Sequence, residues 1–394
     1  MAGRGVLDSD EAARRLGVKL PTLYAYVSRG LLTSHPAPEG RRSLFLAEEV
    51  EALARRSRGG RRTETRLATV TTGTTQLRDD GPVYRGTAAT ELAVSVPYEE
   101  AAELLWQGDG PAPRPWAAVP LDPPDDLGTS DRFRWAVIMA GAGDDLRSDL
   151  RPEAVRAAAR RITATLVRTV PGTAAPSPAL DLGAGPVEGT VAEALTARLA
   201  PDPDGALVRA VNAALVLLAD HELAASTLAV RVAASARADL YDAVLAGLAV
   251  MGGTLHGGAS QLAYGLLREA GAAGPAQALN DTLRWGRVLP GFGHTVYRRA
   301  DPRFTVLRSM VHDIATPAFA RTLGAVVDLA GERGLPPPNV DLGLGALAVA
   351  AGMPADAGRT LFTVARVAGW TAHYLEELEE QPLRYRARAV YARR

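Results

Sequence analysis

Three short stretches in the second half of the chain each hold one acid–base residue beside glycines or at an expected helix start. They are GGTLHGGASQ with His256, LPGFGHTVYRRADPRF with His294, and PPPNVDLGLG with Asp341. A weakly acidic carbon loses its proton to a carboxylate only where preorganised donors stabilise the developing oxyanion. Two imidazoles and one carboxylate therefore predict proton abstraction from carbon, followed by carbon–carbon bond formation.

The glycines beside the two histidines favour close approach of a substrate to the backbone. His256 lies between two Gly-Gly pairs, and we expect a helix to begin just after it. Because a helix N-terminus disfavours an added positive charge, His256 is expected to be neutral and to donate a hydrogen bond. His294 ends PGFGH, whose glycines give the same backbone access. An ordinary turn histidine is the alternative for His256.

The other candidate residues also have structural alternatives. His221, in LLADHELAAST, has the context of a satisfied core histidine within a long apolar helix. Asp341 precedes an apolar helical run, where its role would be that of an N-cap. Arg303 and Arg366 have surface charge as the alternative. Arg366, however, interrupts the apolar stretch LFTVARVAGW, and a buried arginine needs an anion.

Composition excludes several kinds of chemistry. The 394 residues include no cysteine, which excludes thiolate nucleophiles, disulfides and cysteine zinc sites. Lys19 is the only lysine, so the rest of the chain offers neither a lysine Schiff base nor a lysine-bearing phosphate loop. The N-terminus lacks an apolar signal core, and no run of roughly 18 apolar residues occurs. We therefore expect a cytoplasmic protein without a membrane partner.

Charge is unevenly distributed although the formal net charge is zero. Residues 1–66 hold 13 Lys and Arg against 8 Asp and Glu, and the remainder holds 31 against 36. A basic head on an acidic body indicates two modules with different partners.

The head is expected to form two short helices and a basic wing. Ser9 is placed to cap the first helix, DEAARRLG, and Pro21 to begin the second, PTLYAYVSRG. This pattern resembles a MerR-type winged helix-turn-helix domain over about residues 6–56. We assign residues 1–56 to this domain and residues 57–66 to a basic linker.

The resemblance implies possible contacts with DNA. Groove contacts would come from Thr22, Tyr24, Tyr26 and Arg29, and phosphate contacts from Arg41 and Arg42. Because Arg29 is the only cation of the expected recognition helix, a module used for packing or dimer contact is the alternative.

The body, residues 67–394, is predicted to be mainly α. A β-hairpin is expected over residues 67–90 with its turn at Asp79 to Pro82. Long segments rich in Ala, Leu and Arg then favour helices, and the lack of strand–helix alternation argues against a doubly wound sheet. We interpret LGAGPVEG (182–189) as a plain loop, because it lacks the spacing of a nucleotide-binding turn.

The body resembles the citrate synthase family, because several pieces occur in the order that the family shows. These pieces are VYRGTAATELA, YEEAAELLW, LLADHELAAST, LHGGASQ, PGFGHTVYRRADPR, NVD and ARVAGWTAH. The resemblance implies a homodimer of helical subunits with a large and a small domain that close over the substrates. The small domain corresponds roughly to residues 260–355.

The family resemblance also implies roles for the three residues named first. Asp341 would take a proton from the methyl group of acetyl-CoA, and His256 would donate to the thioester oxygen. His294 would polarise and protonate the keto oxygen of oxaloacetate. Hydrolysis of the resulting thioester would release citrate and CoA. No metal or redox cofactor is implied.

Binding residues follow from the same resemblance. Those expected around oxaloacetate are His221, Arg303 and Arg366, with Arg386 from the tail of the partner subunit. Those expected at CoA are the backbone of Gly291, Phe292 and Gly293, and Arg298 through phosphate.

Two positions depart from the family pattern. Ser260 stands where asparagine is usual, and Ala387 where proline usually follows the tail arginine. These departures leave the choice of acyl group open, because one methylene changes discrimination by only ~1–3 kcal/mol. A 2-methylcitrate synthase that uses propionyl-CoA is thus one alternative. A DNA-binding regulator whose body senses metabolites is another.

Overall fold

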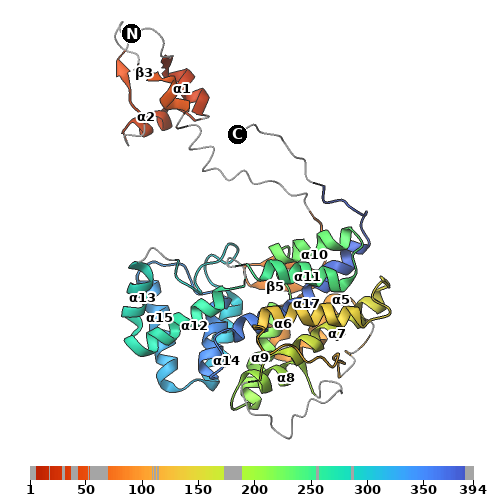
Figure 1. Ribbon diagram of the computed structural model, residues 1–394. Helices are drawn as coiled ribbons and strands as arrows, with labels where there is room; N and C mark the ends of the chain where they lie inside the picture. Colours follow the sequence, from red (N-terminus) through yellow and green to blue (C-terminus); the bar gives the residue numbers. More distant parts are fainter. Residues whose placement is uncertain are drawn as a thin grey trace. The chain divides into compact units, whose positions relative to one another are not determined.

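The computed structural model describes residues 6–16, 18–28, 32–36, 43–51, 53, 70–108, 110, 112, 115–172, 189–253, 257–284 and 288–386. The chain divides into two units, Met1–Thr69 and Val70–Arg394. Figure 1 draws both units, each of which has its own hydrophobic core.

The first unit combines two helices with a small antiparallel sheet. Its elements are β1 (Val6–Asp8), α1 (Ser9–Leu16), α2 (Leu20–Ser28), β2 (His35–Pro36) and β3 (Ser43–Leu46). The strands lie in the order β1-β3-β2. Leu23 and Phe45 are fully buried between the helices and the sheet. The two helices and the strand pair match the expected helix-turn-helix and wing, although the wing tip (37–42) lies outside the described residues.

The cap of α1 differs from the prediction. Strand β1 ends at Asp8, so its side chain directly precedes the helix and accepts a hydrogen bond from Glu11 N at 2.8 Å. Ser9 lies inside the helix, with its Oγ 3.1 Å from the Tyr24 hydroxyl. Asp8 rather than Ser9 therefore caps α1, and Ser9 instead connects the two helices.

The second unit opens with the predicted hairpin. Strands β4 (Thr75–Arg78), β5 (Gly81–Tyr84) and β6 (Thr87–Ala88) form an antiparallel sheet in that order. Thr75 pairs with Tyr84 and Arg78 with Gly81, which places the turn at residues 79 and 80, inside the predicted turn.

Helices make up most of the second unit. They are α4 (Ala89–Ser95), α5 (Tyr98–Trp106), α6 (Thr129–Ala142), α7 (Pro152–Thr169), α8 (Val191–Leu199), α9 (Gly205–Leu218), α10 (Ala225–Ser235), α11 (Leu240–Met251), α12 (Ala259–Ala273), α13 (Pro275–Arg284), α14 (Pro302–Ile314), α15 (Pro317–Glu332), α16 (Val340–Ala350) and α17 (Ala357–Leu378). The mainly α prediction is confirmed for the described part of the body. Of the helices in these ranges, none has the length and apolar character needed to cross a membrane.

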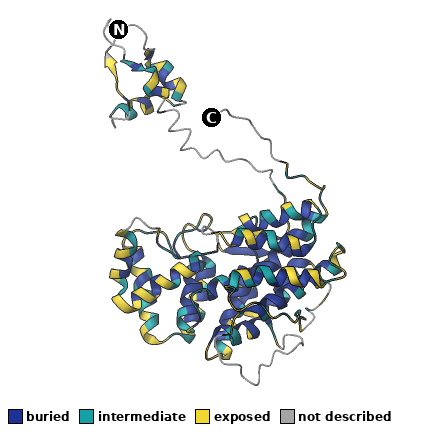
Figure 2. Ribbon diagram, viewed as in Figure 1, coloured by how far each residue is buried: buried dark blue, intermediate teal, exposed yellow. Residues whose placement is uncertain are grey.

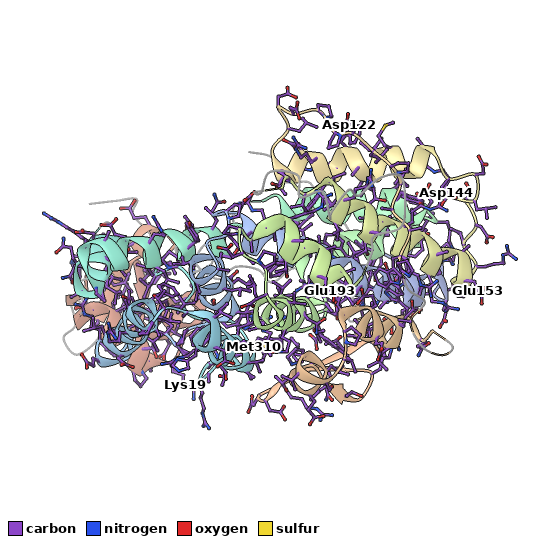
Figure 3. All side chains as sticks on the ribbon, turned by 90° about the horizontal axis from the view of Figure 1, so that it is seen from below. Lys19, Asp122, Asp144, Glu153, Glu193 and Met310 are labelled. Carbon is purple, nitrogen blue, oxygen red and sulfur yellow. The ribbon has the colours of Figure 1, made fainter. Side chains whose placement is uncertain are left out.

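The helices form two groups. Helices α12 to α15 lie together on one side of the unit, and α5, α6, α7, α10 and α11 lie on the other (Figure 1). Buried residues gather where the helices of the second group meet α17 (Figure 2). Asp144, labelled in Figure 3, accepts a hydrogen bond from Tyr241 at 2.7 Å and pairs with Arg161 at 3.0 Å. These two contacts fasten the end of α6 to α11 and α7.

The long helix predicted through LLADHELAAST is wrong. Helix α9 ends at Leu218 and α10 begins at Ala225, so His221 lies in the connection between them. The break is possible because tertiary donors satisfy the last carbonyls of α9. The Tyr84 hydroxyl lies 3.0 Å from Val216 O, and Gly369 N donates to Ala219 O at 2.9 Å.

The loop prediction for residues 182–189 falls on residues outside the described ranges, except for Gly189.

Candidate active site

One pocket of about 390 Å³ gathers most of the predicted chemical residues. Its lining includes His221, His294, Arg303, Asp341 and Arg366, which come from four separate parts of the chain. His256 lies outside the described residues. The predicted residues therefore bring two imidazoles, two guanidinium groups and a carboxylate to the pocket, whose lining also includes Glu222.

Asp301 connects the elements that carry the base and one cation. Its carboxylate accepts hydrogen bonds from Arg303 Nε at 3.0 Å and from Arg303 Nη2 at 2.9 Å. It also accepts one from the backbone N–H of Arg303 at 3.1 Å. The same carboxylate accepts Val340 N at 3.0 Å. It thus joins the starts of α14 and α16 and brings Asp341 near Arg303. Sequence reasoning missed Asp301, although Asp before Pro302 is a helix-start signal.

Asp341 lies in the first turn of α16 but does not cap it. Asn339 is the cap: its Oδ1 accepts Asp341 N at 2.9 Å, and its Nδ2 donates to Gly293 O at 2.7 Å. Burial raises the pKa of Asp341 to about 6, with Arg303 lowering it and Asp301 raising it further. A carboxylate whose pKa lies close to neutrality is suited to act as a general base.

The tautomer of His294 follows from its neighbours. Its Nδ1 accepts backbone N–H groups from Val296 at 3.0 Å and Tyr297 at 3.2 Å. Burial, and then the charge of Arg303, lowers its pKa, so the ring is neutral and carries its proton on Nε2. His294 therefore offers one N–H donor.

His221 is held edge-on against two rings. Its ring lies 5.2 Å from that of His294 and 5.6 Å from that of Tyr297, centroid to centroid. Burial, followed by the charges of Arg303 and Arg366, holds its pKa well below the usual value. Among the described residues its buried Nε2 has no hydrogen-bond partner, so this atom is available to bond a ligand. Tyr297 was not predicted; it stacks on His294 at 4.8 Å.

Arg366 is 1 % exposed and reaches the pocket from the middle of α17. Its Nε donates to Leu218 O at 2.9 Å, and its guanidinium lies 4.6 Å from the Phe362 ring centroid. Burial lowers its pKa, and the charge of Asp220 partly offsets this effect. Together with Arg303, which is 2 % exposed, it makes the pocket suited to a dianion.

The PGFG segment packs closely against the start of α16. Gly291 and Gly293 have φ values of 79° and 80°, and a Cβ on Gly291 would lie 2.8 Å from the side chain of Leu342. Phe292 forms a β-bridge with Pro338. Glycine is therefore required here both by conformation and by space. Arg298 is exposed and lines a neighbouring pocket of about 620 Å³.

The remaining predicted residues lie away from the pocket or outside the described ranges. Arg386 is exposed and does not line this pocket. In the first unit Thr22 is exposed, Tyr24 is 46 % exposed, and Tyr26 packs against the core. Arg29, Arg41 and Arg42 lie outside the described residues. Within the described ranges no group of three or more His, Asp or Glu residues is arranged to hold a metal ion.

Comparisons with known proteins divide the chain in a similar way. A family model described as the C-terminal domain of citrate synthase matches residues 59–388. A model described as a helix-turn-helix domain matches residues 6–58.

Individual relatives are similar over most of the chain. The 2-methylcitrate synthase 2 of Corynebacterium glutamicum is 29% identical over 76% of this chain and 86% of that protein. Citrate synthase 2 of Bacillus subtilis is 28% identical over 82% of this chain and 94% of that protein. A solved citrate synthase from Thermoplasma acidophilum, in a ternary complex with carboxymethyl coenzyme A and oxaloacetate, superposes with a TM-score of 0.64 at 25% identity. That match covers 86% of this chain and 96% of the solved one.

Proposed function

The chain belongs to the citrate synthase family, and we propose on this premise that it condenses acetyl-CoA with oxaloacetate and water to give citrate and CoA. The observation that carries the proposal is the single pocket in which Asp341, with a pKa of about 6, lies beside a neutral histidine donor and two buried arginines.

Proton removal comes first. The Asp341 carboxylate takes a proton from the carbon next to the thioester carbonyl, and the carbonyl oxygen gains the charge. His256 donates a hydrogen bond to that oxygen, as the family resemblance implies. Because the thioester is only a weak carbon acid, the step depends on a donor that is already in place.

Bond formation uses the second histidine. The enolate carbon attacks the keto carbon of oxaloacetate as the thioester carbonyl re-forms, and the keto oxygen takes the proton from His294 Nε2. The hydrogen bonds that Val296 N and Tyr297 N donate to Nδ1 fix this proton on Nε2 in advance. His294 regains a proton from solvent, to which Asp341 releases the proton that it took from carbon. Water then cleaves the thioester, which releases CoA and leaves the new carboxylate on citrate.

Oxaloacetate brings two carboxylates, for which the pocket has two guanidinium groups. Arg303 is held rigidly by Asp301, and Arg366 by the carbonyl of Leu218. The unpartnered Nε2 of His221 supplies a further polar contact. The complex of the Thermoplasma acidophilum relative with carboxymethyl coenzyme A and oxaloacetate supports this choice of ligands.

Two further parts of the proposal concern assembly and CoA. The PGFG backbone and Arg298 contact the CoA nucleotide, the arginine through phosphate. A homodimer completes each site with Arg386 of the other subunit. The exposed position of Arg386, outside its own chain's pocket, supports this arrangement.

Release of free thiol tests which acyl-CoA the protein uses. Full-length protein is incubated with oxaloacetate and either acetyl-CoA or propionyl-CoA, and free thiol is measured. Faster turnover with acetyl-CoA is expected, whereas faster turnover with propionyl-CoA would make the protein a 2-methylcitrate synthase. One similar relative carries each name. Absence of turnover with both would refute the enzyme proposal.

DNA binding by the first unit is a second function that the helix-turn-helix match favours. The exposed Thr22 and Tyr24 on α2 are available for contacts. A mobility assay compares the full chain with a chain lacking residues 1–66 on genomic fragments. A shift that depends on residues 1–66 is expected. An unshifted probe with the full chain would leave the unit with a packing or dimer role.

A further inference from the structure

A buried charged network, whose residues do not line the pocket, takes no part in the proposed chemistry. Its centre is Arg231 on α10, which is fully buried. Arg231 donates to Glu376 at 2.5 Å and to Glu377 at 2.8 Å, both at the end of α17. Its Nη1 also lies 2.9 Å from His373 Nδ1. Burial acts to lower the pKa of Arg231, but the bonds to Glu376 and Tyr385 raise it above its usual value.

The network fixes the tautomer of His373. Arginine only donates hydrogen bonds, so His373 Nδ1 must accept from Arg231 and the ring proton must lie on Nε2. His373 Nε2 lies 3.2 Å from Asp220 Oδ2 and therefore donates to it. Both side chains are fully buried.

Asp220 then shapes the turn that carries His221. Its Oδ2 accepts not only His373 Nε2 but also the backbone N–H of Glu222 at 3.2 Å. Glu222 has a φ of 55°, a conformation that costs energy for a residue other than glycine and persists only when its surroundings fix it. The hydrogen bond from Glu222 N to Asp220 thus spans His221, which lies between these two residues in the sequence.

Asp220 also acts on Arg366. Burial acts to raise the pKa of Asp220, but His373 and then Arg366 lower it, so the group is a carboxylate at neutral pH. The same charge raises the pKa of the buried Arg366. Two of the groups assigned to oxaloacetate, His221 and Arg366, thus depend on the position of Asp220.

We propose that His373 is a positioning residue for the binding of oxaloacetate. His373 acts through Asp220, whose carboxylate fixes the turn that carries His221. This inference rests on the proposed function for the identity of the ligand. His373 touches no substrate; its role is to hold the Asp220 carboxylate where it accepts Glu222 N and faces Arg366.

A matched pair of substitutions tests this role. His373→Gln keeps an N–H donor that reaches Asp220, whereas His373→Asn keeps an acceptor for Arg231 but is too short to reach Asp220. We expect His373→Asn to raise KM for oxaloacetate by about 10- to 100-fold, since small misplacements of binding groups have effects of this size. KM for the acyl-CoA should stay unchanged, and His373→Gln should restore most of the oxaloacetate affinity.

Tyr374→Phe is the control. Tyr374 is the next residue of α17, and its hydroxyl donates to Ala238 O at 2.7 Å, away from Asp220. Loss of this hydroxyl removes a hydrogen bond from the same helix and should leave the KM values for oxaloacetate and for the acyl-CoA unchanged.

Calorimetric titration with oxaloacetate alone separates this inference from the proposed function. If the wild type binds oxaloacetate without turnover, the function fails while the His373 dependence of binding is still measured. Equal oxaloacetate affinity in the wild type and in His373→Asn would overturn the proposal. A His373→Asn protein that does not fold would also overturn it, because the bond would then serve stability alone.

Discussion

Replacement of the proposed base, Asp341→Asn, should greatly slow turnover and stabilise the protein at the same time. Asparagine has the same shape but no charge. Burial raises the pKa of Asp341 from 3.8 to about 6, so the folded state opposes ionisation of this group. A tenfold change in an acid constant corresponds to about 1.4 kcal/mol. The ionised carboxylate therefore costs about 3 kcal/mol of stability at pH 8.

The sign of this effect gives it a specific pH dependence. Because the folded state holds the proton more tightly than the unfolded chain, stability falls as the pH rises from 3.8 to about 6. Above that range the full cost applies. Asp341→Asn should thus gain about 3 kcal/mol at pH 8 and roughly half of this at pH 5. Denaturant unfolding of both proteins at the two pH values measures the gain.

The catalytic rate of Asp341→Asn should fall although its stability rises. Loss of a general base lowers the rate by about 100- to 10,000-fold, and the kcat/KM of the wild type should fall below about pH 6 as Asp341 takes up its proton. A loss of stability in Asp341→Asn at pH 8, or an equal gain at both pH values, would contradict the raised pKa of Asp341. Retained turnover would show that another group is the base.

Three further substitutions test other parts of the account. Arg366→Gln should raise KM for oxaloacetate by about 10- to 100-fold, because hydrogen bonds to charged groups contribute about 1.5–3 kcal/mol; an unchanged KM would remove Arg366 from the site. Tyr84→Phe should lower the free energy of unfolding by about 1–3 kcal/mol, because buried carbonyls at the end of α9 lose their donor; unchanged stability in denaturant would contradict this packing. In Gly369→Ala the new Cβ would meet Asp220 Oδ1 at 2.3 Å and Ala219 O at 2.5 Å. That protein should be strongly destabilised and should bind oxaloacetate more weakly, and wild-type behaviour in both assays would contradict the close packing of Asp220.

The sequence predicted those parts of the site that local motifs encode. His294 and Asp341 stand beside glycines or at a helix start, and such positions have recognisable patterns. Arg366 was predicted because a charge interrupts an apolar helix, and the structure places it in the pocket. The hairpin and the mainly α character of the body followed from turn residues and apolar periodicity.

Features that depend on distant contacts were not predictable in this way. The break at His221 arises because donors from Tyr84 and Gly369 satisfy the end of α9, and periodicity continues across the break without a signal. Asp301 showed a helix-start pattern, but only the fold reveals that its carboxylate also accepts a hydrogen bond from Val340 N at the start of α16. The link between His373 and Asp220 spans 153 residues and has no local signature.

The reaction proposed for this pocket joins the carbon next to a thioester carbonyl to the keto carbon of oxaloacetate. The most direct measurement is mass spectrometry of the product after incubation of the full-length protein with oxaloacetate and acetyl-CoA labelled with ¹³C in its acetyl group. A labelled tricarboxylate is expected with the wild type, and about 100- to 10,000-fold less of it over the same time with Asp341→Asn. Label that stays in acetyl-CoA, or appears only as free acetate, with the wild type would contradict the proposed condensation.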